Sequence, residues 1–468
     1  METKKRFSLI GDRQFYKKVF LITVPIIVQN GITTFVGLLD NIMVGQVGTE
    51  QMSGVAIANQ LVFIFNLCIF GAVAGAGILG AQFYGSGNYD GMRNTFRFKL
   101  LSGIVLCLVF FGIFTFGGET LIQAFLHEGE SSGDLMATLG YGKQYLMVML
   151  VGLVPFAMTQ GYSGTLRETG QTVVPMTAGI VAVFVNLVFN YILIFGKFGA
   201  PALGVVGAAI ATVISRYVEF AIVAVWTHSH SDQNHFIRGA FRNFRIPAPL
   251  VKQIFIVGLP LFVNELLWSC GMTFMNQCYS VRGLEVVAAF NIANTIGNVF
   301  NVVFLSLGNA VGIIIGQLLG AGKLEQARRE DNQLIAFSVF CCLITGSTMC
   351  IVAPFFPEFY NTDELVKGLA TQLIFISGVC QPIYGFVHAT YFTLRAGGKS
   401  IITFLFDSAY MWALSIPVVF ILSRFTGLSI QMVYLISMLT DLIKVAIGFV
   451  LVKKGVWMET IVEKDNKE

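Results

Sequence analysis

Predominantly apolar segments, about twelve of them in two sets of six, constrain this 468-residue chain more than any other feature. A helix that crosses a bilayer needs about 20 such residues. Only 12% of the residues are charged, about half the share in soluble domains, so the apolar surface must face something other than water. We predict an all-α integral membrane protein. The expected spans are 17–45, 53–84, 97–117, 140–164, 173–196, 204–227, 250–279, 286–319, 334–356, 368–393, 400–422 and 428–452.

The two sets of six are related by an internal repeat. A shift of 235 positions aligns Pro25 with Pro260 and keeps one register for more than sixty residues. Later in each half, Leu166-Arg167 aligns with Leu394-Arg395 at a shift of 228. Further residues of the first half that match at the first shift are Gly48, Glu50, Ile57, Ala58, Asn59, Phe65, Asn66, Gly77, Ile78, Gln82, Gly85 and Gly87.

Each repeat holds an even number of spans, so both halves enter the membrane in the same orientation. They are then related by a pseudo-two-fold axis along the membrane normal, as in some secondary transporters. We predict two pseudo-symmetric six-helix bundles that rock to expose a cleft alternately on each side. The predicted parts are an N-lobe (1–227), a cytoplasmic linker (228–249), a C-lobe (250–453) and a cytoplasmic tail (454–468).

The loops between the spans predict the orientation. Loops on one side carry most of the Lys and Arg residues, whereas the opposite loops are mainly acidic. Loops rich in Lys and Arg stay in the cytoplasm. With an even number of spans both termini lie on that side. The sequence therefore predicts a multi-pass protein of the cytoplasmic (inner) membrane with both termini in the cytoplasm.

Asp40 is the strongest candidate for a functional carboxylate. It lies late in the first span, without a basic residue within one helical turn. A charge near the bilayer centre costs at least about 2.5–3.5 kcal/mol. Asp40 is therefore either a residue that caps a loop at the interface or a carboxylate that binds a proton or Na⁺. We favour the second interpretation, because binding of a cation could then couple to a change of conformation.

Polar residues of the fifth and sixth spans could complete such a site. Asn186 and Asn190 are four residues apart and share one helix face. Their amide oxygens suit Na⁺ and can also hydrogen-bond a protonated acid, and Thr212 could add a hydroxyl. The alternative is that the two amides only tie neighbouring helices together.

Two further acids are candidates for a substrate or ion role in the C-lobe. Glu265 follows Pro260 by five residues, and its repeat equivalent is Asn30, so the two halves are functionally unequal. Asp407, in the eleventh span, is equally open to a structural role. Asp441 and Lys444 are three residues apart on the last span, and we interpret them as a structural pair within one helix.

Several other functions are not supported. The Gly75-Ala-Gly77-Ile-Leu-Gly80 segment fits a dinucleotide pattern, but it lies inside a span and does not follow a soluble strand, so we expect it to allow close helix packing. The chain has no Walker motif, which argues against an ATP-driven pump, and no arrangement of a nucleophile with a base. It has no basic face with interleaved aromatic residues, so nucleic acid is not an expected partner.

Taken together, these motifs resemble the multidrug and toxic compound extrusion (MATE) transporters over essentially the whole length. The segments that carry the resemblance are Pro25 followed by Asp40 and Ile-Met-Val-Gly45, the 75–85 segment, Leu166-Arg167-Glu-Thr-Gly170-Gln, Asn186-Leu-Val-Phe-Asn190, Gly207-Ala-Ala-Ile-Ala-Thr212 and Leu394-Arg395-Ala-Gly-Gly398.

The resemblance implies a cation site formed by Asp40, Asn186, Asn190 and Thr212, with Na⁺ or a proton as the ion. The N-lobe is similar to the NorM type, because Asn190 stands where other members carry an Asp. The C-lobe departs from the family. The acid expected in the tenth span is replaced by Tyr384, with Gln381 nearby. A second-lobe site would therefore involve Glu265, Tyr384, Gln381 or Asp407.

The resemblance further implies a secondary active antiporter that exports amphipathic, often cationic, small molecules in exchange for Na⁺ or H⁺. We expect a monomer in the lipid bilayer, with no cofactor and no enzymatic activity. A flippase for lipid-linked glycans, from the same wider superfamily, is the alternative within transport. A membrane-embedded enzyme or receptor is the alternative outside it.

Overall fold

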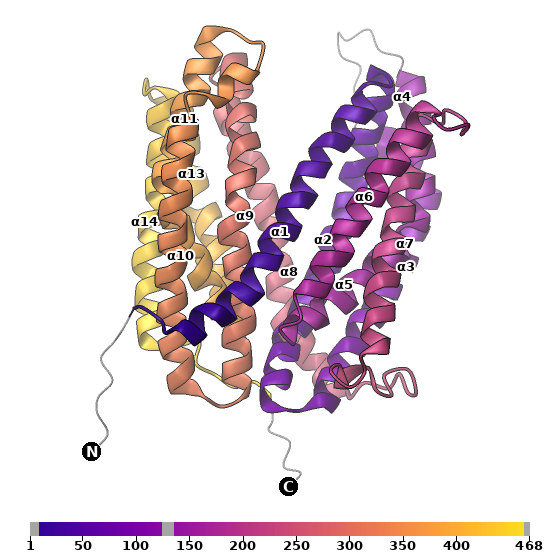
Figure 1. The fold of residues 1–468 in the computed structure, drawn as a ribbon. Helices are drawn as coiled ribbons and strands as arrows, with labels where there is room; N and C mark the ends of the chain where they lie inside the picture. The colour runs from indigo at the N-terminus through magenta and orange to yellow at the C-terminus, as the bar shows by residue number, and fades with distance from the viewer. Residues whose placement is uncertain (1–8, 124–134, 463–468) are drawn as a thin grey trace. The chain divides into compact units, whose positions relative to one another are not determined.

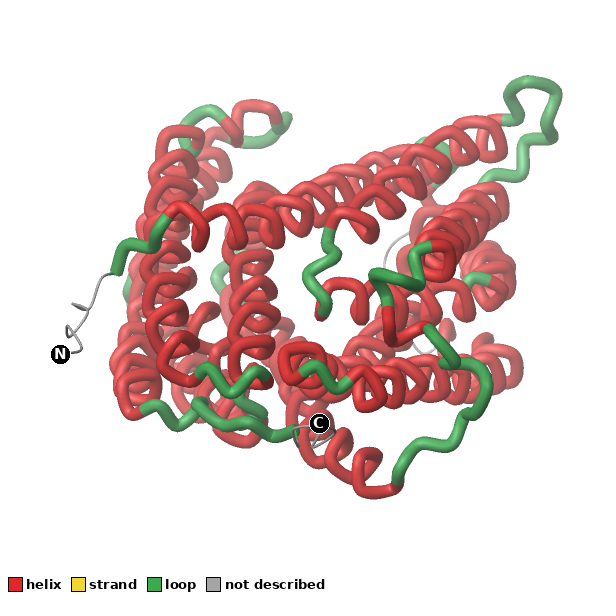
Figure 2. The backbone as a smooth tube through the Cα atoms, turned by 60° about the horizontal axis from the view of Figure 1, so that its bottom comes forward, coloured by secondary structure: helices red, strands yellow, loops and turns green. Residues whose placement is uncertain are grey.

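A computed structural model describes residues 9–123 and 135–462, and within them the chain is helical without any strand (Figures 1 and 2). The first eight residues of the predicted N-lobe and the last six of the predicted tail lie outside these ranges. The first half contains α1 (Arg13–Gly45), α2 (Thr49–Ser86), α3 (Tyr89–Gln123), α4 (Leu135–Val151), α5 (Leu153–Glu168), α6 (Val173–Phe195) and α7 (Val205–Ser229). The second contains α8 (Ala248–Ser280), α9 (Leu284–Gly320), α10 (Leu324–Val352), α11 (Glu364–Ala396), α12 (Ser400–Phe404), α13 (Ile416–Phe425) and α14 (Ile430–Lys454).

These helices confirm the predicted number of spans. Within residues 9–123 and 135–462, eleven stretches of helix are long and apolar enough to cross a membrane, and a bent pair makes a twelfth. The bent pair is α4 and α5, which meet at 47° next to Gly152. The eleventh span, Ser400–Phe425, is continuous but contains two π-helical turns, η3 (Leu405–Ala409) and η4 (Met411–Ser415), between α12 and α13. Single π turns in helices often mark functional sites.

The chain divides into two compact units. The N-terminal unit comprises Val28–Gly80 and Tyr89–Phe255, and the C-terminal unit comprises Met1–Ile27, Ala81–Asn88 and Ile256–Glu468. The division differs from the predicted lobe boundaries, because the start of α1 and the end of α2 belong with the second half, and residues 228–255 belong with the first. Phe15, Val19 and Ile26 join the apolar core of the C-terminal unit, which gives the first part of α1 its place there.

The end of α2 crosses α9 within the C-terminal unit at two glycines that the repeat relates. A Cβ atom on Gly85 would overlap the backbone of Gln317, and one on Gly320 would overlap the backbone of Gln82. The shift of 235 positions that aligns Gly85 with Gly320 also aligns Gln82 with Gln317. The contact of Gly85 with Gln317 and the contact of Gly320 with Gln82 are therefore equivalent under the repeat.

The segment after α14 closes this crossing. Gln82 Nε2 donates to the carbonyl of Ala396 at 2.9 Å, and Gln82 Oε1 accepts from the amide of Ile461 at 2.8 Å. Thr460 Oγ1 donates to the carbonyl of Leu319 at 2.7 Å, and the Trp457 side chain is fully buried. Of the predicted tail, the part up to residue 462 is thus packed against the C-terminal unit.

The glycines of the dinucleotide-like segment pack against a buried ion pair in the N-terminal unit. Lys99 Nζ lies 2.5 and 2.7 Å from the two carboxylate oxygens of Glu168 and 3.0 Å from Thr165 Oγ1. A Cβ atom on Gly80 would overlap the Glu168 carboxylate, and one on Gly77 would lie 3.0 Å from it. The segment lies in α2, so the structure agrees with a packing role.

The predicted linker is folded onto the N-terminal unit. It contains a short 3₁₀ helix, η1 (His235–Ile237), in which Phe236 and Ile237 are buried. Arg97 holds the following turn, because its guanidinium donates to the carbonyls of Ala240 and Gly239 at 2.7 and 2.8 Å.

Candidate functional site

In the N-terminal unit, the four predicted cation-site residues come together from three helices. Asn186 and Asn190 are buried on one face of α6, and Asn190 Nδ2 donates to Asn186 Oδ1 at 3.2 Å. Asp40 reaches them from α1, because Asn190 Nδ2 also donates to Asp40 Oδ1 at 2.7 Å. Thr212 on α7 accepts from Asn186 Nδ2 at 3.3 Å. Contact among these residues is therefore observed, while their role in ion coupling stays a prediction.

The amide of Asn186 can serve this group in two orientations. With its oxygen and nitrogen interchanged, the nitrogen lies 2.9 and 3.1 Å from the two oxygens of Asp40, and the oxygen accepts from Thr212 Oγ1. Asn190 binds the carboxylate in the first orientation, and in the second Asn186 donates to both of its oxygens. The carboxylate is therefore held by neutral donors from α6.

The packing of α6 against α7 places Thr212 in this group. Gly207, near the start of α7, lies so close to the backbone of Leu193 in α6 that a side chain would not fit. Thr212 lies seven residues after the first residue of α7, which is about 10 Å along the helix. The group is thus inside the helical unit and not at its end.

The oxygens of this group suit a small hard cation. Asn190 Oδ1 is buried and has no hydrogen-bond partner in the described part of the chain. Together with the Asp40 carboxylate, Asn186 Oδ1 and Thr212 Oγ1, it offers oxygen donors of the kind that bind hard cations. A protonated Asp40 could instead donate to one of the amide oxygens. The same residues can therefore hold Na⁺ or a proton.

Sequence reasoning missed two neighbours of this site. Tyr145 in α4 is buried, interacts electrostatically with Asp40 and donates to Asn59 Oδ1 at 3.2 Å. In the sequence, Asn59 was noted only as part of the repeated Ile-Ala-Asn motif, which does not indicate a position near Asp40. Nothing in the local sequence of Tyr145 indicates that it approaches Asp40.

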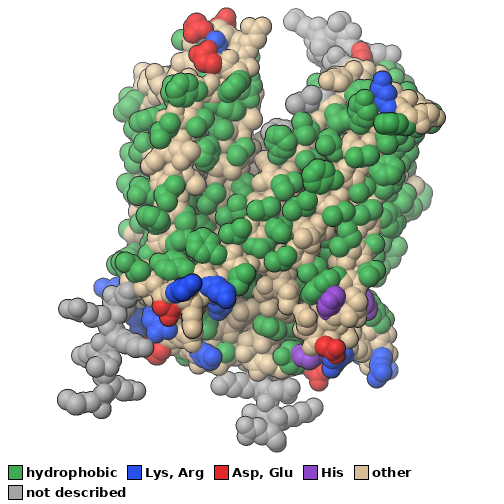
Figure 3. All heavy atoms as spheres, viewed as in Figure 1, with side chains coloured by type: hydrophobic (Ala, Val, Ile, Leu, Met, Phe, Trp, Pro, Cys, Tyr) green, Lys and Arg blue, Asp and Glu red, His purple; other side chains and the backbone are tan. Residues whose placement is uncertain are grey.

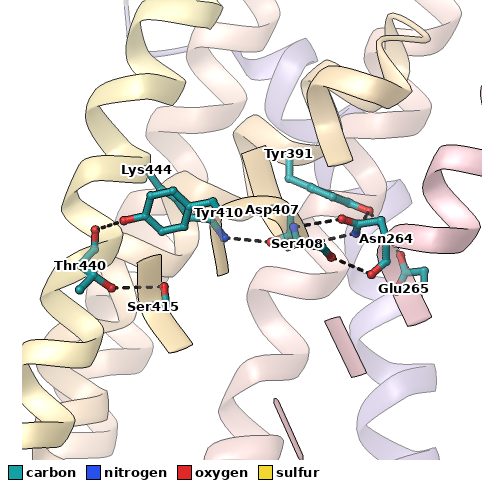
Figure 4. Close-up of polar contacts among 9 residues, drawn as sticks. All are labelled: Asn264, Glu265, Tyr391, Asp407, Ser408, Tyr410, Ser415, Thr440 and Lys444. Atoms are coloured by element: carbon teal, nitrogen blue, oxygen red, sulfur yellow. Dashed lines mark hydrogen bonds and ion pairs between the residues drawn. The ribbon is translucent and has the colours of Figure 1, made fainter. Parts of the chain in front are cut away.

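The C-terminal unit holds a second polar cluster, centred on Asn264 of α8 (Figure 4). Asn264 Nδ2 donates to Asp407 Oδ2 at 3.1 Å and lies 3.3 Å from the hydroxyl of Tyr391. Its Oδ1 accepts from the backbone amide of Ser408 at 3.2 Å, and its carbonyl accepts from Ser408 Oγ at 2.7 Å. Asn264 thus fixes the π-helical turn that carries Asp407.

Asp407 has a cationic partner that the sequence interpretation assigned elsewhere. Lys444 Nζ on α14 donates to Asp407 Oδ1 at 2.9 Å. We expected Lys444 to pair with Asp441 on its own helix. Asp441 does interact electrostatically with Lys444, but the ion pair of Lys444 is with Asp407. The observed partner lies 37 positions earlier, and the rotation of the π turn η3 brings it toward α14.

Glu265 joins the same cluster from its other side. Its Oε1 accepts from the hydroxyl of Tyr391 at 3.3 Å and lies 4.0 Å from Arg395 Nη1. About a third of the Glu265 side chain is exposed. Of the acids proposed for the C-lobe, Glu265 and Asp407 are therefore brought together, through Asn264 and Tyr391.

Gln381 and Tyr384 have other contacts. Gln381 is buried and donates to Asn301 Oδ1 on α9 at 3.1 Å. Tyr384 stacks on Phe304 with ring centroids 5.9 Å apart and lies beside His388. His388 interacts electrostatically with both Asp407 and Lys444, so Tyr384 borders the polar cluster. None of the described contacts of Gln381 joins it to that cluster.

Comparison with known proteins matches the chain to one family. The MatE family model matches residues 25–192 and 260–421, one stretch in each repeat. The probable multidrug resistance protein NorM of Thermotoga maritima is 25% identical over 438 residues, covering 91% of this chain and 89% of the relative. The probable multidrug resistance protein YoeA of Bacillus subtilis is 25% identical over 424 residues, covering 89% of this chain and 88% of the relative.

The fold is also that of solved transporter structures. One structure, described as the outward-facing conformation of a multidrug resistance MATE family transporter of the MOP superfamily, is similar with a TM-score of 0.85. The alignment covers 96% of each chain at 20% sequence identity. This likeness confirms the expected all-helical, two-bundle fold.

Proposed function

Because the chain belongs to the MatE family of membrane transporters, we propose that it is a secondary active antiporter that exports amphipathic and cationic drugs in exchange for Na⁺ or H⁺. Its relatives are named as multidrug resistance proteins, which supports drugs as the substrate class. It acts as a transporter and not as an enzyme, in agreement with the sequence.

One observation carries the coupling step of this proposal. The hydrogen-bond partner of Asp40 in the described residues is a neutral amide, in either orientation of Asn186. Its negative charge inside the helical unit is thus left for a mobile cation to neutralise. Binding of that cation would favour a conformation with weaker drug affinity, and by linkage drug binding would favour release of the cation.

The ion gradient provides enough free energy for export. One charge that moves down a membrane potential of about 100 mV releases about 2.3 kcal/mol. At 1.4 kcal/mol per factor of ten, this supports a roughly fifty-fold gradient of a neutral drug. One-for-one exchange of a monovalent cationic drug moves no net charge, so the concentration gradient of the ion drives its export. Export requires the cation to enter from outside. We place the protein in the inner membrane with both termini in the cytoplasm. We expect a monomer to suffice for transport.

Transport by purified protein in sealed vesicles tests the proposal. We expect uptake of a fluorescent cationic drug when a Na⁺ or a proton gradient is imposed, and the gradient that drives uptake identifies the ion. Asp40→Asn should fold normally, because an amide still fits beside Asn190, but drug exchange should fall to the level of empty vesicles. Asp12→Asn is the matched control, since Asp12 only caps the start of α1 through the Phe15 amide at 2.7 Å. Ion-driven exchange by folded Asp40→Asn protein would reject the role of Asp40.

A further inference from the structure

The Asp407–Lys444 pair is built as a site for an ammonium group. Lys444 is 6% exposed, and its Nζ lies 5.7 Å from the ring centre of Phe406 and 5.4 Å from that of Tyr410. The carboxylate of Asp407 receives the ammonium on one oxygen and the Asn264 amide on the other. A carboxylate and two aromatic rings around a cation are a combination that binds ammonium ions well.

The repeat shows what this pair replaces. At the shift of 235, Asp40 aligns with Met275, so the second half has no carboxylate there. At the shift of 228, Thr212 aligns with Thr440, and Thr440 Oγ1 lies 3.4 Å from Ser415 Oγ. The two Asn residues have no equivalent there, because Asn186 aligns with Leu414 and Asn190 with Val418. The C-terminal unit thus retains the hydroxyl of the first site at Thr440 without its acid or its amides.

The basic residue of the last span is treated differently in the two halves. The shift of 228 aligns Arg216 with Lys444. Arg216 donates to the carbonyl of Gly152 at 3.2 Å and lies over the Phe156 ring. Asp40 is therefore left to neutral amides, whereas Asp407 of the C-terminal unit is bound by the side chain of Lys444. One half has a carboxylate for a mobile cation, and the other has a carboxylate with a tethered one.

We propose that Lys444 is the resident cation of the C-terminal unit, occupying permanently the site that a mobile coupling ion would otherwise take at Asp407. Ions then exchange at Asp40 alone, with one cation site per chain that cycles. This step rests on the proposed antiport at Asp40. It explains why a buried acid in the second half need not bind an ion from solution.

Removal of one charge and removal of both have opposite expected results. A buried charge that loses its partner is strongly destabilising, whereas replacing both charges by neutral groups of similar shape is often tolerated. Lys444→Met and Asp407→Asn should each lower the melting temperature and reduce drug exchange about tenfold or more. The double variant should recover both, with exchange within about twofold of wild type and an unchanged ion-to-drug ratio. Lys444→Arg, which keeps the charge, should behave like wild type.

Two results would contradict the proposal. Loss of exchange in a folded double variant would mean that Asp407 itself exchanges an ion. Wild-type stability and a wild-type ion-to-drug ratio in Lys444→Met would mean that the charge of Asp407 does not need Lys444 to neutralise it. Failure of the antiport proposal has a different signature, namely continued exchange in Asp40→Asn. Recovery of stability in the Asp407–Lys444 double variant would still be expected in that case.

A binding measurement keeps the test decisive if the double variant does not fold. Lys444→Ala leaves space for the three carbons and the ammonium of propylammonium. Added propylammonium should raise the melting temperature of this variant in a saturable manner, while propanol should not. The same titration of wild-type protein should show no such rise, because Lys444 fills the site. Equal responses of wild-type and Lys444→Ala protein would overturn the proposal.

Discussion

Lys99 and Glu168 form an ion pair that is almost completely shielded from solvent. Their side chains are 0% and 9% exposed, and Thr165 provides a further partner for the ammonium. Neither residue belongs to the proposed cation site. The contacts of Glu168 with α2 at Gly77 and Gly80 indicate that this pair joins α2, α3 and α5.

We expect either Lys99→Met or Glu168→Gln to lower the free energy of unfolding by about 3–5 kcal/mol, because each leaves a buried charge without its partner. The double variant should lose much less. Lys143→Gln is the control, since Lys143 and Glu119 form an ion pair of similar length, 2.6 Å, with half of each side chain exposed, and should cost at most about 1 kcal/mol. Denaturation in detergent measures all four proteins, and additive single and double effects would contradict this account.

At the scale of the elements, the crossing of α2 and α9 depends on two small residues. Gly85 and Gly320 each face a backbone carbonyl of the other helix, at Gln317 and Gln82. Because both positions are helical, backbone conformation does not require glycine there. The requirement comes from the close approach of the two helices.

Gly85→Ala and Gly320→Ala should each lower the free energy of unfolding by about 1–3 kcal/mol, the usual cost of overpacking. Gly297→Ala in the same α9 is the matched control. A Cβ atom there meets nothing within 4 Å, so the substitution should stabilise the helix by about 0.5–1 kcal/mol. Thermal unfolding distinguishes the two cases. Equal melting temperatures for Gly320→Ala and Gly297→Ala would show that the crossing tolerates a methyl group.

At the scale of the whole molecule, the charges at the ends of the helices bear on orientation. On the visible face of the C-terminal unit, Lys and Arg side chains gather at one end of the helices and acidic side chains at the other (Figure 3). Glu358 lies in the connection between α10 and α11, Glu364 is the first residue of α11, and both bind Lys367 at 3.0 Å. The end that holds most of the basic residues is the one predicted to face the cytoplasm.

Labelling with a membrane-impermeant maleimide tests this orientation. Asp363→Cys, next to α11, should be labelled in intact spheroplasts. Lys323→Cys, between α9 and α10, should be labelled only after permeabilisation, because its loop lies on the side rich in Lys and Arg. Both positions are exposed, and the native cysteines provide the blank. The reverse labelling pattern would contradict the predicted topology.

Much of the architecture could be predicted because it follows from local properties of the chain. The length of an apolar segment determines whether a helix can span a membrane, so the twelve spans were predictable. The positions of Asn186 and Asn190 on one face follow from helix geometry alone. Their contact with Asp40 was expected from the resemblance to the family and not from spacing.

Other features depend on how the helices are rotated and packed, and these were decided only in three dimensions. Lys444 could reach an acid on its own helix or one on a neighbouring helix, and local spacing favoured Asp441. Asp407 lies in a π-helical turn, which no residue pattern predicted, and from there it contacts Lys444. The first part of α1 also belongs to the C-terminal unit because of tertiary packing. Its apolar side chains pack in the core of that unit, although the chain continues from α1 into the N-terminal unit. The sequence alone thus determined the spans, the repeat and the candidate acids, and the tertiary structure decided which acid has a tethered cation and which does not.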